Sequence, residues 1–325
     1  MPELPEVETI KRQLSDVLIG QIITDIDILN PKSFHGEITS IIGMQISGIR
    51  RFGKVLVIDL KSQMSFVVHL KMTGQLVFEC HESGDESQEN WQSHLHKRRL
   101  AGGHPTGDFV GELPSKHTRI MIKLKGNSGK RKTIVESEKT ADEDVSDQSS
   151  DVAILYFNDQ RKFGWMKLVP TEEVEKLSFI EKLGQEPVDF DEDEWVKVLK
   201  SSRKAVKVRL MDQDRIAGVG NIYANDGCWE ACVDPRRPAN SLSESESFQL
   251  LKAVRKVLEE GIYYGGATAG DGKYINLQGM GGKYQEHFRV YQREGDSCLR
   301  SGCKGVIQKT MVGGRGTFWC GECQV

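Results

Sequence analysis

Four cysteines near the end of the chain have the spacing of a metal site. Cys298 and Cys303 are separated by four residues, Cys320 and Cys323 by two, and sixteen residues lie between the two pairs. A span of that length can form a β-hairpin, which brings four thiolates within reach of one tetrahedral ion. The spacing predicts one structural Zn ion, with free or disulfide-linked cysteine pairs as the alternative. Four protein ligands would leave no position open for catalysis.

The first residues of the chain offer a nucleophile beside an acid. Removal of Met1 would give Pro2 a secondary amine, and because an α-amino pKa lies near ~7.7 to 8.0, part of it is unprotonated at neutral pH. Such an amine forms an iminium directly when it attacks a sugar C1′. Glu3 and Glu6 place carboxylates nearby that can move protons. The alternative is structural, since proline and acids are common in the first turn of a helix.

The elements that must position these groups differ between the two halves of the chain. A helix is predicted after Pro2, because apolar residues recur every three or four positions before Gly20: Val7, Ile10, Leu14, Val17 and Leu18. Apolar runs typical of strands follow at 21–29, 54–60, 64–72, 118–124 and 152–157. They predict an α+β fold, with an N-terminal helix and an antiparallel β-sandwich or barrel of about eight strands.

Polar and acidic segments divide the chain. Residues 80–115 are rich in His, Gly and Ser, and residues 126–151 have the composition of an acidic disordered loop between two strands. The acidic stretch 170–195 places a domain boundary near Pro170. We expect a catalytic β-sandwich domain over 1–170 with polar insertions at 80–115 and 126–151, a helical domain over 171–285 and a four-cysteine finger over 286–325.

The second half shows helical periodicity. Ser243 and Glu246 have capping-box spacing and precede an amphipathic run that should end near Gly261. The glycine-rich stretch 265–282 predicts a mobile loop.

Charge and hydropathy limit the partners of the chain. The formal net charge of −3 argues against a polyanionic binding partner such as a nucleic acid. Residues 197–325, however, carry 20 Lys and Arg against 14 Asp and Glu, so this part of the chain is basic. A locally basic surface is sufficient for binding phosphates, although an ordinary solvated surface is the alternative. No run approaches the ~18 apolar residues of a membrane span, and no secretory signal is evident. We therefore expect a cytoplasmic protein with reduced cysteines and no membrane partner.

Five motifs, in this order, resemble one family. They are MPELPEVET at 1–9, HLKMTG at 69–74, NDQRKFG at 158–164, GVGNIYA at 218–224 and GGRGTFWCGEC at 313–323. Together they resemble bacterial formamidopyrimidine-DNA glycosylase, and the resemblance covers nearly the whole chain apart from the two polar insertions. It implies a zinc-bound β-hairpin, a helix–two-turns–helix motif and a bifunctional base-excision repair enzyme, both N-glycosyl hydrolase and DNA-(apurinic or apyrimidinic site) lyase, that removes oxidised purines such as 8-oxoguanine and formamidopyrimidines.

The resemblance also implies catalytic roles. Pro2 would be the nucleophile that attacks C1′ and holds the sugar as a Schiff base, and Glu3 the acid that assists opening of the sugar ring. Lys54 would donate a proton in β-elimination, and Arg315 would grip phosphates and serve δ-elimination. The product would be a gap with phosphates at both ends.

Further residues match DNA contacts of the family. Met72, Arg161 and Phe163 would fill the space left by the flipped base, since apolar wedges open base steps and Arg can bond the widowed base. Without the resemblance, Met72 and Phe163 would be assigned to the core. The remaining matches are Asn221, whose alternative is a helix cap, and a set of side chains whose alternative is plain surface: His117, Arg203, Lys207 and Tyr291.

Two other functions stay open at this point. A sister branch of similar fold and chemistry prefers oxidised pyrimidines, although Leu4 and the three void-filling residues favour the purine branch. A zinc protein that binds damaged DNA without catalysis is the second alternative, and intact Pro2 and Glu3 argue against it. A general zinc-ribbon transcription factor would leave the β domain unexplained. We expect the partner to be damaged double-stranded DNA and the protein to be a monomer. Lys71 departs from the small residue common in the family, which leaves the base preference open.

Overall fold

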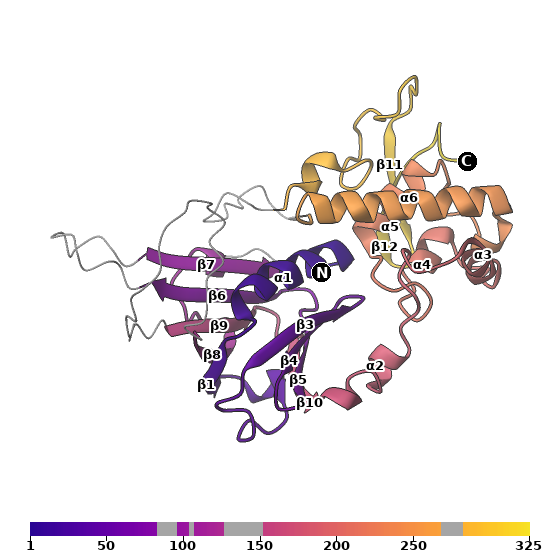
Figure 1. Cartoon of the computed structure of the whole chain (residues 1–325). Coiled ribbons are helices and arrows are strands. Elements are labelled where there is room, and N and C mark those ends of the chain that lie inside the picture. Colours follow the sequence, from indigo (N-terminus) through magenta and orange to yellow (C-terminus); the bar gives the residue numbers. More distant parts are fainter. Residues whose placement is uncertain (83–95, 104–106, 127–151, 268–281) are drawn as a thin grey trace, which may run out of the picture.

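The computed structural model describes residues 1–82, 96–103, 107–126, 152–267 and 282–325. Its first half contains α1 (Leu4–Leu18) and ten strands in two five-stranded sheets (Figure 1). One sheet has the order β1 (Ile22–Ile28), β8 (Thr118–Lys125), β9 (Val152–Asp159), β6 (Gly74–Glu82) and β7 (His96–Gly103). The other has the order β2 (Phe34–His35), β10 (Trp165–Pro170), β5 (Met64–His69), β4 (Val55–Leu60) and β3 (Ile46–Phe52).

The sandwich is antiparallel apart from the short β2–β10 pair, which is parallel. Its core lies between the sheets and takes in the predicted apolar face of α1. That helix begins with a capping box between Glu3 and Glu6 and ends before Gly20, whose φ of +93° favours glycine. The helix prediction is confirmed.

All five predicted strand runs are strands, but others were not predicted. β3, β6, β7 and β10 contain glycines or charged residues, such as Arg50 and Arg51 in β3, that obscure the alternation of apolar positions. The expectation that 80–115 is a polar insertion is wrong in part, because the end of β6, all of β7 and a short 3-10 helix (Gly107–Phe109) lie in it. The expected acidic loop joins β8 to β9, which pair directly, and its residues 127–151 lie outside the described part.

The second half is helical. It contains α2 (Ser178–Glu181), α3 (Glu192–Lys200), α4 (Val206–Leu210), α5 (Asn221–Glu230) and α6 (Glu244–Tyr263). Short 3-10 helices lie at Thr171–Glu173, Ala239–Ser241 and Tyr284–His287, and another in the first half lies at Pro31–Ser33. Ser243 caps α6 as predicted, and the helix runs two residues past Gly261. The core of this half includes Leu4, so α1 belongs to both cores. Of the glycine-rich stretch 265–282, residues 268–281 lie outside the described part.

A two-stranded hairpin completes the chain. Its strands are β11 (Ile307–Val312) and β12 (Arg315–Cys320), and β12 packs against α5 (Figure 1). Among the described residues, none of the helices has both the length and the apolar character needed to cross a membrane.

Candidate active site

The start of α1 meets the N-terminal end of α5. The Glu3 carboxylate accepts hydrogen bonds from the backbone N–H groups of Ile222 at 2.9 Å and Tyr223 at 3.4 Å. These groups have no partner within their own helix, and the positive end of the helix dipole favours a carboxylate there. A Cβ on Gly220 would lie 2.2 Å from the Glu3 carboxyl carbon, so glycine is required for this approach. The residues GVGN at 218–221 therefore leave space for the Glu3 carboxylate at the N-terminal end of α5, where backbone N–H groups bind it.

Burial gives Glu3 the pKa of a proton donor at neutral pH. Its side chain is 3% exposed, and this burial raises its pKa to about 7 against the lowering effects of Lys54 and the two N–H donors, while Glu6 adds to the rise. A carboxyl group with such a pKa exists in both forms near pH 7, which suits general acid–base work.

Lys54 reaches the same place from the sandwich. It follows the turn between β3 and β4, is buried, and donates from Nζ to the Val219 carbonyl at 2.8 Å. Burial lowers its pKa, and Arg315 acts in the same direction, whereas Glu3 and Glu6 oppose the change. Because its pKa is lowered, Lys54 gives up a proton more readily than an exposed lysine does.

The N-terminal amine lies among these groups. Burial lowers the pKa of the Met1 amine, and the side chains whose charges act on it are Glu3, Glu6, Lys54 and Arg315. Pro2 itself is buried. Arg315 is exposed at the start of β12, after a turn in which Gly313 and Gly314 have positive φ. The charges of Lys54, from the β3–β4 turn, and of Arg315, from β12, thus both act on the N-terminal amine beside Pro2 and Glu3.

Glu6 is a site residue that sequence reasoning left without a role of its own. Its Oε2 accepts from the Glu3 backbone N–H at 2.8 Å, as in the capping box. Its Oε1 accepts from the Tyr223 hydroxyl at 2.8 Å and from the Ala267 N–H at 2.7 Å. The structural interpretation of the acidic N-terminus is confirmed, because Glu6 caps α1. Glu6 also joins the start of α1 to α5, and the chemical interpretation stays a prediction. The capping-box spacing was the signal available in the sequence.

The three void-filling candidates project from two neighbouring loops of the sandwich. Met72 is 42% and Phe163 60% exposed, so the alternative that places them in the core is wrong. Arg161 is exposed as well, and its Nη1 lies 3.4 Å from the Met72 sulfur. The three side chains form one exposed group with two apolar members.

Asp159 fixes these loops and was not predicted. It is fully buried, and its Oδ1 accepts from the Thr73 hydroxyl and from the Arg161 N–H at 3.1 Å. Its Oδ2 accepts from the Gly164 N–H at 2.6 Å. One carboxylate therefore connects the Met72 loop to both ends of the Arg161–Phe163 segment. The motif NDQRKFG contained it, but no sequence pattern distinguishes a buried Asp from a turn residue.

Lys207 and Asn221 hold the hairpin against the helices. Lys207 is fully buried and donates from Nζ to the Gly316 carbonyl at 2.6 Å and the Thr317 hydroxyl at 2.8 Å. The alternative of plain surface is wrong, because protein groups enclose the ammonium, and a direct DNA contact stays a prediction. Asn221 donates to the same Gly316 carbonyl at 3.3 Å, while its Oδ1 is buried and accepts from no described donor.

The other three matches with DNA contacts of the family are Tyr291, His117 and Arg203. Tyr291 is half-buried between the rings of Phe288 and Phe318. His117 lies with Nδ1 2.8 Å from an Asp108 carboxylate oxygen, and Arg203 is exposed before α4. None of these three residues contacts Pro2, Glu3 or Lys54 among the described interactions.

The four predicted cysteines come together. Their sulfur atoms all lie within 4.8 Å of one another, and the Cys298–Cys323 and Cys303–Cys320 distances are both 3.7 Å. Disulfides are excluded for these pairs, since a disulfide requires about 2.05 Å. Tetrahedral thiolates at about 2.3 Å from Zn²⁺ would be about 3.8 Å apart. The cluster therefore fits a structural metal.

Comparison with known families agrees with this geometry. Residues 1–166 match the family model of the formamidopyrimidine-DNA glycosylase N-terminal domain, and residues 183–272 match that of the formamidopyrimidine-DNA glycosylase H2TH domain. The chain is 34% identical to the formamidopyrimidine-DNA glycosylases of Pelotomaculum thermopropionicum and Desulforamulus reducens, in each case over 100% of this chain and 99% of the relative.

Solved structures extend the likeness to the fold. A Lactococcus lactis Fpg in complex with DNA that contains an abasic site is similar with a TM-score of 0.74 and 28% identity over 99% of both chains. A mutant of that enzyme in complex with Fapy-dG-containing DNA gives the same values. On the family models and the full-length relatives, the chain belongs to the formamidopyrimidine-DNA glycosylase family of base-excision repair enzymes.

Proposed function

We propose that the chain excises oxidised purines, 8-oxoguanine and formamidopyrimidines, from duplex DNA and then cuts the strand by β,δ-elimination. The observation that carries this proposal is that Glu3 and Lys54 bind neighbouring groups at the N-terminal end of α5, where the charges of both and of Arg315 act on the N-terminal amine. The Lactococcus lactis complexes with Fapy-dG and abasic-site DNA are consistent with it.

The chemistry follows from the arrangement. After removal of Met1, the Pro2 nitrogen attacks C1′, the damaged base leaves, and the open sugar is held as an iminium. Glu3, with a pKa of about 7, gives a proton to the sugar ring oxygen as the ring opens. Lys54 supplies the proton in β-elimination, and Arg315 binds the phosphates and serves δ-elimination.

Binding requires the base to leave the stack, which costs a few kcal/mol. Met72, Arg161 and Phe163 form an exposed group suited to enter the space that the base vacates. Asn221, Tyr291, His117 and Arg203 are proposed as further DNA contacts. Lys207 holds the hairpin that carries Arg315 and is proposed as a positioning residue instead.

Zinc is proposed as the structural ion. Cys298, Cys303, Cys320 and Cys323 would hold one Zn²⁺, which supplies no reaction step because no coordination position is left open. Since these thiols must stay reduced, the cytoplasm is the compartment that suits them. A monomer with three units, 1–170, 171–285 and 286–325, remains our proposed organisation.

Borohydride trapping tests the proposal. Untagged protein shown by mass to begin at Pro2 is incubated with a duplex that carries one 8-oxoguanine, and with a thymine-glycol duplex for comparison. We expect a covalent adduct that maps to Pro2 on the first duplex. Preference for the second duplex would assign the chain to the pyrimidine branch. Binding without an adduct on either duplex would contradict the catalytic assignment.

A further inference from the structure

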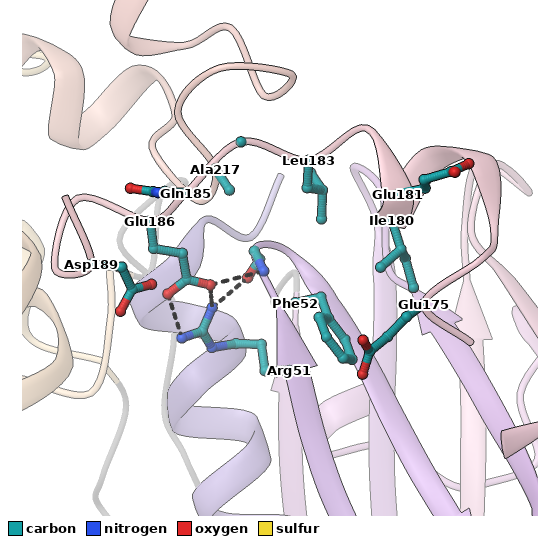
Figure 2. Close-up of a pocket in the computed structure, with 12 residues that line it drawn as sticks. Arg51, Phe52, Glu175, Ile180, Glu181, Leu183, Gln185, Glu186, Asp189 and Ala217 are labelled. Carbon is teal, nitrogen blue, oxygen red and sulfur yellow. Dashed lines mark hydrogen bonds and ion pairs between the residues drawn. The ribbon is translucent and has the colours of Figure 1, made fainter. Parts of the chain in front are cut away.

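The two halves of the chain face each other across a cavity beside the active site. The cavity has a volume of about 600 Å³ and is lined from the sandwich side by Arg51, Phe52 and Gly53. The opposite wall comes from segment 175–189 and Ala217 (Figure 2). Beside the cavity, Val174 and Ile180 pack in one apolar cluster with Val55 and Val57 of β4. Across the cavity itself the halves are joined by polar contacts, because close packing cannot span such a space.

The closest of the ion pairs between the described residues of the two halves is that of Arg51 with Glu186, while Arg50 lies 3.6 Å from the exposed Glu175. Arg51 Nη1 lies 2.5 Å from Glu186 Oε1 and Nη2 lies 2.9 Å from Oε2, which is a two-pronged contact (Figure 2). The Gly53 N–H donates to the same Oε1 at 3.0 Å. Both side chains are mostly buried, so the pair is screened less by solvent than a surface pair.

The sandwich end of this pair is rigid. Arg51 Nε donates to Glu8 Oε2 of α1 at 2.9 Å, and Nη1 donates to the Gly53 carbonyl at 2.9 Å. Gly53, with φ +54°, forms the turn that leads directly to Lys54. The guanidinium therefore ties together α1, the turn and Glu186, and the turn determines where the lysine begins.

The Glu186 end is equally fixed to the helical half. Its neighbour Gln185 accepts from the Ala217 N–H at 2.9 Å, and the Gly184 N–H donates to the Gln213 carbonyl at 2.9 Å. Gln213 in turn donates from Nε2 to the Val219 carbonyl at 2.8 Å. That carbonyl is the acceptor of Lys54 Nζ, and it immediately precedes the N-terminal end of α5 where Glu3 is bound.

We propose that the Arg51–Glu186 pair is a positioning clamp that sets the distance between the Lys54 turn and the N-terminal end of α5. Glu186 touches no reacting atom, so it is a positioning residue. The proposal rests on the function proposed above, since it assigns the clamp to that same site. Loosening the clamp lets Lys54 and Glu3 move relative to the amine, and a misplacement of about 1 Å can cost ~10²-fold in rate.

Single-turnover kinetics with graded variants test the clamp. Glu186→Gln removes the negative charge and one of the two hydrogen bonds to Arg51, and Glu186→Ala removes the whole contact. Arg51→Lys keeps the positive charge but cannot form the two parallel hydrogen bonds of a guanidinium. The matched control is Glu181→Gln, which removes a charge from the same cavity wall. We measure the borohydride-trapping rate on an abasic-site duplex and the Kd for duplex with a tetrahydrofuran site. A third measurement is hydrogen exchange of the amides at 216–223.

A clamp should affect rate without affecting affinity. We expect Glu186→Ala to lower the trapping rate about 10- to 100-fold and Glu186→Gln less, with Kd within about threefold of wild type. The 216–223 amides should exchange faster, and Glu181→Gln should behave as wild type. The double variant Arg51→Lys/Glu186→Gln should be no slower than the slower single variant, because both remove one interaction.

Three results would overturn the clamp. They are a wild-type trapping rate in Glu186→Ala, unchanged exchange at 216–223, or a rate loss that only follows a fall in the folded fraction. Failure of the proposed function is distinguishable, because it would show as absence of a Pro2 adduct in the wild type. Faster exchange at 216–223 in Glu186→Ala would then still support the clamp as a link between the halves.

Discussion

The carboxyl group of Glu3 is buried at the end of a helix, and near neutral pH it is present in both its protonated and its ionised form. Burial favours the neutral acid, while Lys54 and the two N–H donors favour the carboxylate, and the balance is a pKa of about 7. A general acid must start protonated, so its contribution falls as the pH rises through its pKa. The rate of base excision should therefore depend on pH through Glu3.

The glycosylase rate should decline above about pH 7 as Glu3 loses its proton. Glu3→Gln should lower the single-turnover excision rate by about 10² or more and remove this alkaline limb, because an amide cannot serve as the acid. Single-turnover excision of 8-oxoguanine between pH 5.5 and 9 measures both effects. An alkaline limb that persists unchanged in Glu3→Gln would assign it to another group.

A second prediction concerns the close approach of Gly220 to Glu3. An added Cβ would lie 2.2 Å from the Glu3 carboxyl carbon, and both groups belong to rigid helix termini. Gly220→Ala should lower the free energy of unfolding by about 1 to 3 kcal/mol, as overpacking does, and should also abolish most trapping. Gly48→Ala is the matched control, since nothing lies within 4 Å of a Cβ there. Chemical denaturation of the three proteins measures the difference, and equal stability of the two variants would contradict it.

At the scale of elements, the loops that carry Met72 and Phe163 depend on one buried carboxylate. Asp159→Asn would leave the Gly164 N–H facing an amide and would weaken the bonds to Thr73 and Arg161. We expect excision of 8-oxoguanine to fall about tenfold or more, the cost of one buried group left unsatisfied. Cleavage at an abasic site, where no base must be extruded, should change less.

Comparing the two substrates is the measurement for this prediction. Thr73→Ser keeps the hydroxyl that bonds Asp159 and should behave as wild type, whereas Thr73→Val should resemble Asp159→Asn. Equal losses on both substrates would show that Asp159 supports the fold in general and not the wedge.

The elements that local periodicity encodes were predictable from the sequence. α1, α6 and its capping box, five strands and the cysteine cluster follow from spacing alone. β7 was missed because His96–Gly103 holds three basic residues and two glycines, and its place in the sheet comes from pairing with β6. Local sequence does not encode such tertiary pairing.

The site was predictable where a motif names the residue and not where tertiary contact defines it. Resemblance supplied Pro2, Glu3, Lys54 and Arg315, and in the structure the charges of the last three act on the N-terminal amine next to Pro2. Asp159 and Glu186 act through partners far away in the sequence or on another loop, and a single Asp or Glu carries no pattern. Lys207 shows the reverse case, since its match to a DNA contact did not reveal that it is buried.

For the whole molecule, the candidate active site lies between units with separate cores. The sandwich carries Lys54 and the loops of Met72 and Phe163, the N-terminal end of α5 binds Glu3, and the hairpin carries Arg315. The cysteine cluster lies within the third core, together with Trp229 of α5. The hairpin's attachment to α5 should therefore depend on the proposed zinc ion, whereas the fold of the sandwich should not.

Removing the metal tests this division. After treatment with a chelator, we expect weaker binding to tetrahydrofuran-site duplex and a slope of log K against log salt reduced by about one or more, because the Arg315 phosphate contact is lost. Arg315→Ala in the metal-bound protein should reproduce the reduced slope while leaving thermal unfolding unchanged. The metal-free protein should unfold in two transitions, with the upper one from the sandwich, because the four ligands all lie within residues 298–323 and supply folding energy locally. A single cooperative transition, shifted as a whole, would instead show that the hairpin and the sandwich are coupled through the active site, and the clamp between Arg51 and Glu186 would be the contact to remove next.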